Sequence, residues 1–265
     1  MDKPIGIFDS GIGGLTVVKE VIKLLPYENI IYFGDTARVP YGIKSKETIV
    51  KFSLENTLFL LQKDVKMIVV ACNTSSSLAL SVIRKHFKIP ILGVIIPGAK
   101  EAVYATKNKK IGVIGTRATI NSHAYEEEIK RLDSTVKVFS QACPMFVPIV
   151  EEGWVNDGIA KKVAQKYLLP LKAKGIDTLI LGCTHYPLLK VRIHEIMGKA
   201  VTLIDSAQQV AVEVKQVLSQ EGLLNRKKMR PTREYFVSDE VAIFKNVAKR
   251  FLGSELKEVK RVSNV

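Results

Sequence analysis

The sequence predicts an α/β fold: two similar doubly wound domains with mostly parallel sheets, and an active site in the cleft between them. Two observations lead to this prediction. First, short apolar runs rich in β-branched residues alternate with segments of helical periodicity along the 265 residues, as in sheets whose parallel strands are joined by helices. Second, one pattern occurs twice, at 68–74 and at 179–185: an apolar run, a small residue, a cysteine and then hydrogen-bonding residues.

The first half begins with an apolar run that predicts a strand, followed by a glycine-rich turn. Ser45 is a suitable N-cap for a long helix, because its hydroxyl can accept a hydrogen bond from a free N–H of the first turn. The elements predicted here are, in order, a strand at 5–9, a helix at 15–25, a strand at 29–34, a helix at 46–63, a strand at 68–71, a helix after Cys72 and a strand at 89–94.

The pattern restarts after Pro97. Residues 111–116 resemble 5–10 in their apolar run, in the glycine at the second position and in the hydroxyl at the end, and a similar distance separates each strand from its cysteine. The elements predicted here are a strand at 111–115, a helix at 122–132, a strand at 136–142, a helix at 160–172, strands at 179–182 and 201–205, a helix at 206–218, an edge strand at 233–237 and a closing helix. We therefore expect a first domain of residues 1–97 plus 207–265 with Cys72, and a second domain of residues 98–206 with Cys183.

The composition excludes several classes of protein. No apolar run reaches the roughly 18 residues of a membrane span, so we expect no membrane partner. Residues 1–4 lead directly into a strand without a secretory signal. Three widely spaced cysteines do not make a disulfide framework, so we expect a reduced, cytoplasmic protein.

The formal net charge of +14 raises the question of an anionic partner. Its densest cluster is at 226–230, with Arg233 nearby, and indicates either solvated surface or a patch for an acidic partner. The lysines elsewhere are scattered over the helical segments, without the basic stripe and stacking aromatics that are typical of nucleic-acid binding. We therefore expect no nucleic-acid partner.

Cys72 and Cys183 are the strongest candidates for chemistry. Each is predicted at the carboxyl end of a parallel strand, where open α/β sheets bind their ligands. Each also precedes a helix N-terminus, where the helix dipole and free N–H groups lower the pKa of a thiol. Cys143 lacks such surroundings and is expected to be inert core.

Other polar residues fall at the same sheet edge, and each has a structural alternative. Asp9 ends the first strand and is either a turn aspartate or part of the site, and it would repel a phosphate bound at the glycines that follow. Asn73 and Thr74 either cap a helix or offer donors to a carboxylate. The spacing Cys183-x-His185 matches no zinc pattern, so we expect no metal.

Two thiols in two related half-sites suit the inversion of a stereocentre. That reaction needs a base on one face of a carbon atom and an acid on the opposite face, and a thiol can serve as either. Two domains that close on a substrate, each with one cysteine, supply this geometry. Thiol–disulfide exchange fits less well, because its two cysteines are usually close in sequence, as in CxxC.

These motifs resemble those of the cofactor-independent aspartate/glutamate racemase family, and glutamate racemase in particular. The matching segments, in the expected order, are Asp9-Ser10-Gly11-Ile12-Gly13-Gly14, Pro40-Tyr41-Gly42, Ala71-Cys72-Asn73-Thr74 and Gly182-Cys183-Thr184-His185-Tyr186-Pro187. The resemblance implies racemisation of glutamate without cofactor or metal, D-glutamate for peptidoglycan, and a homodimer. One rival is an aspartate or other amino-acid racemase of the same family, and a rival of another class is a basic module that binds nucleic acid or protein.

The resemblance also implies roles for individual residues. Cys72 would remove the α-proton of D-glutamate and Cys183 that of L-glutamate. Asp9 would assist Cys72, and His185 with Glu151 would assist Cys183, although Glu152 could take the place of its neighbour. The substrate would be held by Asp9, Ser10, Tyr41, Gly42, Asn73, Thr74, Thr184 and His185.

Overall fold

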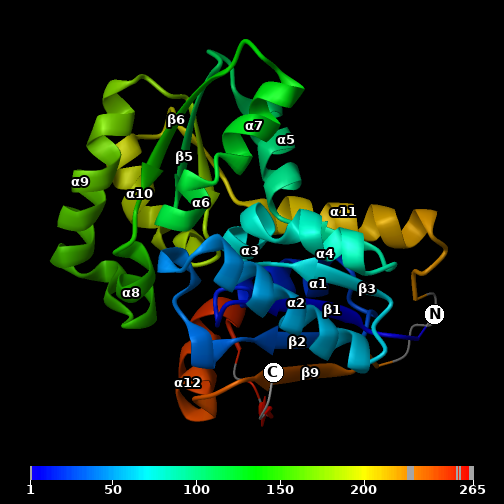
Figure 1. Ribbon diagram of the computed structural model, residues 1–265. Coiled ribbons are helices and arrows are strands. Elements are labelled where there is room, and N and C mark those ends of the chain that lie inside the picture. Colours follow the sequence, from blue (N-terminus) through cyan, green and yellow to red (C-terminus); the bar gives the residue numbers. More distant parts are fainter. Residues whose placement is uncertain (1, 226–229, 255, 257, 263–265) are drawn as a thin grey trace.

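The computed structural model describes residues 2–225, 230–254, 256 and 258–262. It has an α/β fold with two sheets in which every described strand pair is parallel, so the predicted fold class is confirmed (Figure 1). Residues 226–229, which make up most of the predicted basic cluster, lie outside the described residues.

The first sheet has the strand order β10-β9-β2-β1-β3-β4. Its strands are β1 (Ile5–Asp9), β2 (Ile30–Gly34), β3 (Met67–Val70), β4 (Ile91–Gly93), β9 (Arg233–Val237) and β10 (Lys260–Arg261). The prediction that 233–237 forms an edge strand is wrong, because the two-residue strand β10 pairs with β9 on its outer side. A strand that short carries too few residues to produce a sequence pattern.

The second sheet has the order β6-β5-β7-β8, formed by β5 (Lys110–Gly115), β6 (Lys137–Ala142), β7 (Thr178–Gly182) and β8 (Thr202–Ile204). This order matches β2-β1-β3-β4 of the first sheet strand for strand. The repeat seen in the sequence is therefore a repeat of topology, and β3 with β7 occupy corresponding places. Cys72 follows the first of these strands and Cys183 the second.

The helices cover both sheets (Figure 1). They are α1 (Leu15–Leu24), α2 (Lys46–Gln62), α3 (Asn73–Leu78), α4 (Leu80–His86), α5 (Ile95–Ala105), α6 (Arg117–Asn121), α7 (Ala124–Leu132), α8 (Phe146–Glu151), α9 (Gly158–Ala173), α10 (Lys190–Met197), α11 (Ser206–Gln220) and α12 (Val241–Leu252), with short 3-10 turns at η1 (Thr36–Arg38), η2 (Tyr41–Ile43), η3 (Trp154–Asn156) and η4 (Tyr186–Leu189).

Two helix starts show how local sequence acts here. The predicted N-cap Ser45 is confirmed, since its hydroxyl accepts a hydrogen bond from the Thr48 N–H at 3.3 Å. By contrast, α5 was not predicted, and Pro97 lies in its first turn rather than in a break. Proline is tolerated there because the first N–H groups of a helix have no partner inside the helix.

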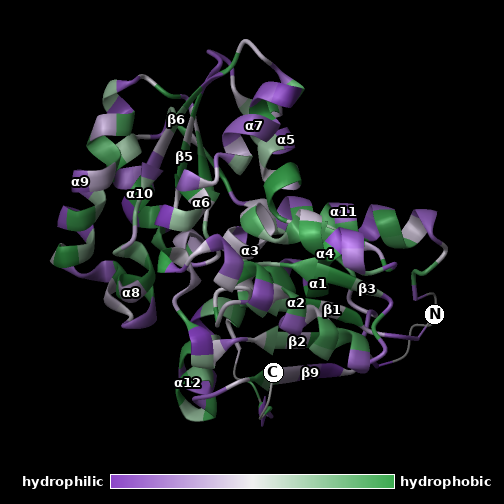
Figure 2. Cartoon of the chain, in the orientation of Figure 1, coloured by the Kyte–Doolittle hydropathy of each residue, from purple (hydrophilic) through white to green (hydrophobic). Residues whose placement is uncertain are grey.

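The core lies between the sheets and the apolar faces of the helices (Figure 2). All residues of β1, β2, β3 and β7 are buried, as expected for parallel strands covered on both faces. None of the helices in the described part of the chain is long and apolar enough to cross a membrane. Buried central strands fix the positions of the loops at their carboxyl ends, where the candidate site lies.

Candidate active site

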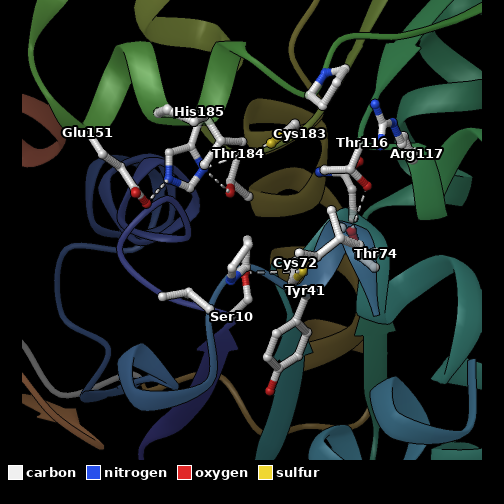
Figure 3. Close-up of a pocket in the computed structure, with 18 of the residues that line it drawn as sticks. Ser10, Tyr41, Cys72, Thr74, Thr116, Arg117, Glu151, Cys183, Thr184 and His185 are labelled. Carbon is white, nitrogen blue, oxygen red and sulfur yellow. Dashed lines mark hydrogen bonds and ion pairs between the residues drawn. The ribbon is translucent and has the colours of Figure 1, made fainter. Parts of the chain in front are cut away.

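A cavity of about 400 Å³ lies between the carboxyl ends of the two sheets (Figure 3). Residues from both halves of the chain line it, including Cys72 and Cys183. The predicted site residues that line it are Ser10, Tyr41, Gly42, Cys72, Asn73, Thr74, Glu151, Cys183, Thr184 and His185. Asp9 is not among the lining residues.

Cys72 follows β3 and occupies the N-cap position of α3. It is 5% exposed, and its thiol donates a hydrogen bond to Ser10 Oγ at 3.6 Å. Burial, and then the negative charge of Asp9, raise the pKa of the Cys72 thiol to about 11, although the Ser75 N–H acts in the opposite direction. The expectation that the helix N-terminus lowers this pKa is therefore wrong, because a six-residue helix offers less stabilisation than burial removes.

Asp9 lies at the end of β1 and is fully buried behind the cavity. Its carboxylate accepts hydrogen bonds from the Gly11 N–H at 3.1 Å and from Thr184 Oγ1 at 3.5 Å. Burial raises the pKa of Asp9, while the charge of His185 and these hydrogen bonds act to lower it. Asp9 thus contacts residues of both half-sites.

Around Cys183 the structure places an imidazole and a carboxylate. His185 Nδ1 lies 3.8 Å from Cys183 Sγ, and His185 Nε2 lies 2.9 Å from Glu151 Oε1, at the end of α8 (Figure 3). Burial acts to lower the pKa of His185, but the hydrogen bonds and charges of Cys183 and Glu151 raise it to about 10. Glu152 also lines the cavity, but it is Glu151 that bonds to His185.

The remaining polar residues come from loops on both sides. Tyr41 lines the cavity, and its hydroxyl donates to buried Asp35 and accepts from Asn56 Nδ2 at 3.1 Å. Asn73 Oδ1 accepts a hydrogen bond from Tyr125 of α7 at 2.7 Å. These bonds fix the loops that carry the cavity-lining groups.

Sequence reasoning missed Thr116 and Arg117, which also line the cavity (Figure 3). Thr116 Oγ1 lies 3.0 Å from both Thr74 Oγ1 and Thr119 Oγ1, so three hydroxyls gather where the two halves meet. The internal repeat contained the signal, because Thr116 stands where Ser10 stands in the first half. The apolar lining, which was also missed, is Val39, Pro40, Ile43, Pro144, Val147 and Pro148.

Two further observations concern candidates outside the pair of thiols. Cys143 is fully buried, as expected. In the described residues, no group of three or more His, Cys, Asp or Glu side chains is arranged to hold a metal ion.

Because donors and titratable groups converge on one cavity from two sides, the site is suited to proton transfer on a small polar molecule.

Comparisons with known proteins agree with this geometry. Residues 10–214 match the model of the family described as Asp/Glu/Hydantoin racemase. The glutamate racemase of Geobacter metallireducens is 52% identical over 261 residues, which cover 98% of this chain and 97% of the relative. The crystal structure of a glutamate racemase from Bacillus anthracis covers 98% of this chain and 97% of its own, with 42% identity and a TM-score of 0.95. The crystal structure of glutamate racemase from Francisella tularensis in complex with D-glutamate covers 99% of this chain and 98% of its own, with 42% identity and a TM-score of 0.93. The chain therefore belongs to the Asp/Glu/Hydantoin racemase family.

Proposed function

We propose that this protein interconverts L- and D-glutamate by moving the α-proton between Cys72 and Cys183, without a cofactor. Relatives of near-identical length that are glutamate racemases support the substrate. The observation that carries the mechanism is the placement of two thiols at corresponding positions of two repeated halves, both lining one cavity.

The proposed reaction uses two cysteines in opposite protonation states, so that one takes up a proton and the other supplies one. One thiolate removes the proton from Cα of glutamate and becomes a thiol, and the electron pair of the broken C–H bond stays on Cα and the adjoining carboxylate. The other thiol then donates its proton to the opposite face of Cα and becomes a thiolate. Hydrogen bonds to the carboxylate stabilise the charge that develops there.

The surroundings of the two thiols support an assignment of their resting roles. Cys72, with its pKa raised to about 11, is a neutral thiol near pH 7 and so an acid. His185, with its pKa raised to about 10, is an imidazolium near neutral pH, and its Nδ1 lies 3.8 Å from Cys183 Sγ. With Cys72 as the acid, Cys183 takes the role of the base, which is the direction that starts from L-glutamate, and Asp9 acts through Cys72.

We propose that the substrate's amino and carboxylate groups are held by the predicted polar residues that line the cavity, Ser10, Tyr41, Gly42, Asn73, Thr74, Thr184 and His185, with Thr116 added. Asp9, which lies behind the cavity, would act on substrate only through Thr184 or Cys72. The alternative within the family is an aspartate substrate. A comparison of kcat/KM for the two amino acids decides between them, and a preference for aspartate would overturn the assignment to glutamate.

The first experiment incubates the protein with L-glutamate in D₂O in the presence of a chelator, and follows optical rotation and α-deuterium together. We expect the rotation to decay as deuterium enters Cα. Replacing Cys72 or Cys183 by Ala should lower kcat/KM by at least about a hundredfold, the typical contribution of one acid or base. Cys143→Ala is the matched control, because Cys143 does not line the cavity. Turnover at the wild-type rate in either cavity variant would refute the two-base mechanism.

The resemblance supports further proposals about the protein's setting. We propose that it is a cytoplasmic homodimer that supplies D-glutamate for peptidoglycan, and that its domains are residues 1–97 plus 207–265 and residues 98–206. In support, the first sheet draws its strands only from the first of these sets and the second sheet only from the other. Sedimentation equilibrium tests the dimer, and a monomer mass at micromolar concentration would contradict it.

A further inference from the structure

Helix α12 follows a strand of the first sheet, yet its end contacts residues around Cys183 in the second half. Two consecutive residues near its end make the contacts. Arg250 Nη1 donates a hydrogen bond to the Glu151 carbonyl at 2.8 Å and lies 3.5 Å from the Val150 carbonyl. The ring of Phe251 meets the His185 imidazole edge to face, with centroids 5.6 Å apart and an interplanar angle of 86°.

Arg250 completes the C-terminus of α8. The last carbonyls of a helix have no partner inside it, and a cation there also interacts favourably with the helix dipole. The chain leaves room for the guanidinium at Gly153, where φ is +78° and a Cβ atom would lie 2.7 Å from the Arg250 guanidinium. Arg250 therefore fixes the backbone of Glu151.

Phe251 restrains the His185 imidazole by packing against its ring. It is 2% exposed and His185 is 5% exposed, so the ring contact is closed to water. The imidazole is then held by four groups: Phe251 against its ring, Glu151 at Nε2, and both Cys183 and Thr184 Oγ1 at Nδ1. Neither Arg250 nor Phe251 lines the cavity.

We propose that Arg250 and Phe251 are positioning residues, which hold Glu151 and His185 in the geometry that lets the imidazole serve Cys183. The proposal rests on the proposed function. It predicts a larger effect on the half-site of Cys183 than on that of Cys72, which feels His185 only indirectly through Asp9.

The experiment needs a readout for each thiol. The two enantiomers of glutamate have equal free energy, so kcat/KM must be the same in both directions and cannot tell one half-site from the other. The rate of iodoacetamide alkylation near neutral pH, measured for each cysteine by mass spectrometry, does separate them. It reports the thiolate, which a neighbouring imidazolium favours.

The variants are Arg250→Met, Arg250→Lys and Phe251→Leu, with Arg131→Met as the control. Arg131 has its guanidinium paired with Glu128 on the surface of α7. We expect Arg250→Met and Phe251→Leu to lower kcat/KM by about tenfold to a hundredfold, because small misplacements of catalytic groups are costly. The loss should fall on kcat more than on KM. Alkylation of Cys183 should slow several-fold while the rate for Cys72 changes much less, and Arg250→Lys should recover part of both losses.

The possible outcomes separate this proposal from the proposed function. If wild-type protein does not exchange the α-proton of glutamate, the proposed function fails, while the alkylation rates still test the positioning role. If Arg250→Met keeps wild-type turnover and Cys183 reactivity, the positioning role fails alone. If both cysteines change reactivity together as the thermal midpoint falls, the two residues serve general stability, and the proposal is overturned.

Discussion

At the scale of residues, the two thiols that line the cavity have unlike electrostatic surroundings. A buried carboxylate, Asp9, lies behind Cys72 and disfavours a second negative charge there. Cys183 instead faces an imidazole whose far nitrogen is bonded to Glu151. These unlike surroundings come from residues that lie far apart in the sequence.

The raised pKa of His185 predicts how stability depends on pH. The folded state holds this proton more tightly than the unfolded state, with a pKa of about 10 against an ordinary value of 6.5. The stabilisation is fully present below about pH 6.5 and is lost as the pH rises through about 10. The free energy of unfolding, measured with urea, should therefore fall across this window.

The variant Glu151→Gln should show a smaller fall, because it removes a charge that raises this pKa. The matched control is Glu152→Gln, since the exposed neighbour does not contribute to the shift. Equal slopes in all three proteins would show that the Glu151–His185 bond does not link folding to protons here.

At the scale of elements, the short turn η2 lines the cavity on the side of the first half and contacts the second half of the chain. Arg38 Nε donates to Asp35 Oδ2 at 2.6 Å, and the Tyr41 hydroxyl bonds to the same carboxylate, so buried charge holds the segment in place. Gly42 then lies against Thr116 at the start of α6. The cavity is closed on this side by contact between two elements from different sheets.

Replacing Gly42 by Ala should therefore impair binding. Its Cβ would lie 2.5 Å from that of Thr116, so η2 and α6 must move apart. We expect KM for glutamate to rise and kcat/KM to fall by about tenfold or more, because hydroxyls at the contact shift with the backbone. In the control Gly158→Ala, the new Cβ meets no atom within 4 Å, and steady-state kinetics should match the wild type. Unchanged KM in Gly42→Ala would show that this contact does not shape the site.

At the scale of the whole molecule, two sheets of matching strand order present their carboxyl ends to one cavity, and the opposite end of the first sheet is held by a buried ion pair. Lys66 Nζ donates to Glu28 Oε2 at 2.5 Å and to the Leu223 carbonyl at 2.8 Å, with both charged side chains 2% exposed. Lys66 immediately precedes β3, and Cys72 follows its other end. The buried ion pair and the proposed catalytic Cys72 thus lie at opposite ends of the same strand.

This separation predicts a variant that loses stability but keeps its catalytic constants. Lys66→Met should lower the free energy of unfolding by about 3–5 kcal/mol, because it leaves the Glu28 carboxylate buried without its cation. The exposed pair of Lys3 and Asp64 provides the control, and Lys3→Met should cost less than about 1 kcal/mol. Urea unfolding and kcat/KM at low temperature are the measurements. A small stability loss in Lys66→Met, or a large loss of kcat/KM in folded protein, would contradict the prediction.

Sequence alone was sufficient for the features that depend on neighbouring residues. The run at 5–9, the Ser45 cap and the repeat around Cys72 and Cys183 follow from periodicity, capping and turn chemistry, which act over a few residues. Those patterns predicted the fold class and five of the residues that line the cavity: Cys72, Asn73, Thr74, Cys183 and His185. The family resemblance added Ser10, Tyr41, Gly42, Glu151 and Thr184.

Tertiary structure decided what depends on contacts between distant segments. It placed β9 inside its sheet, Asp9 behind the cavity and Glu151 rather than Glu152 on His185. It also reversed the expected pKa shift of Cys72 and brought α12 to the second half-site. Burial and charge at a site are sums over groups that the chain brings together only by folding, so no local pattern encodes them.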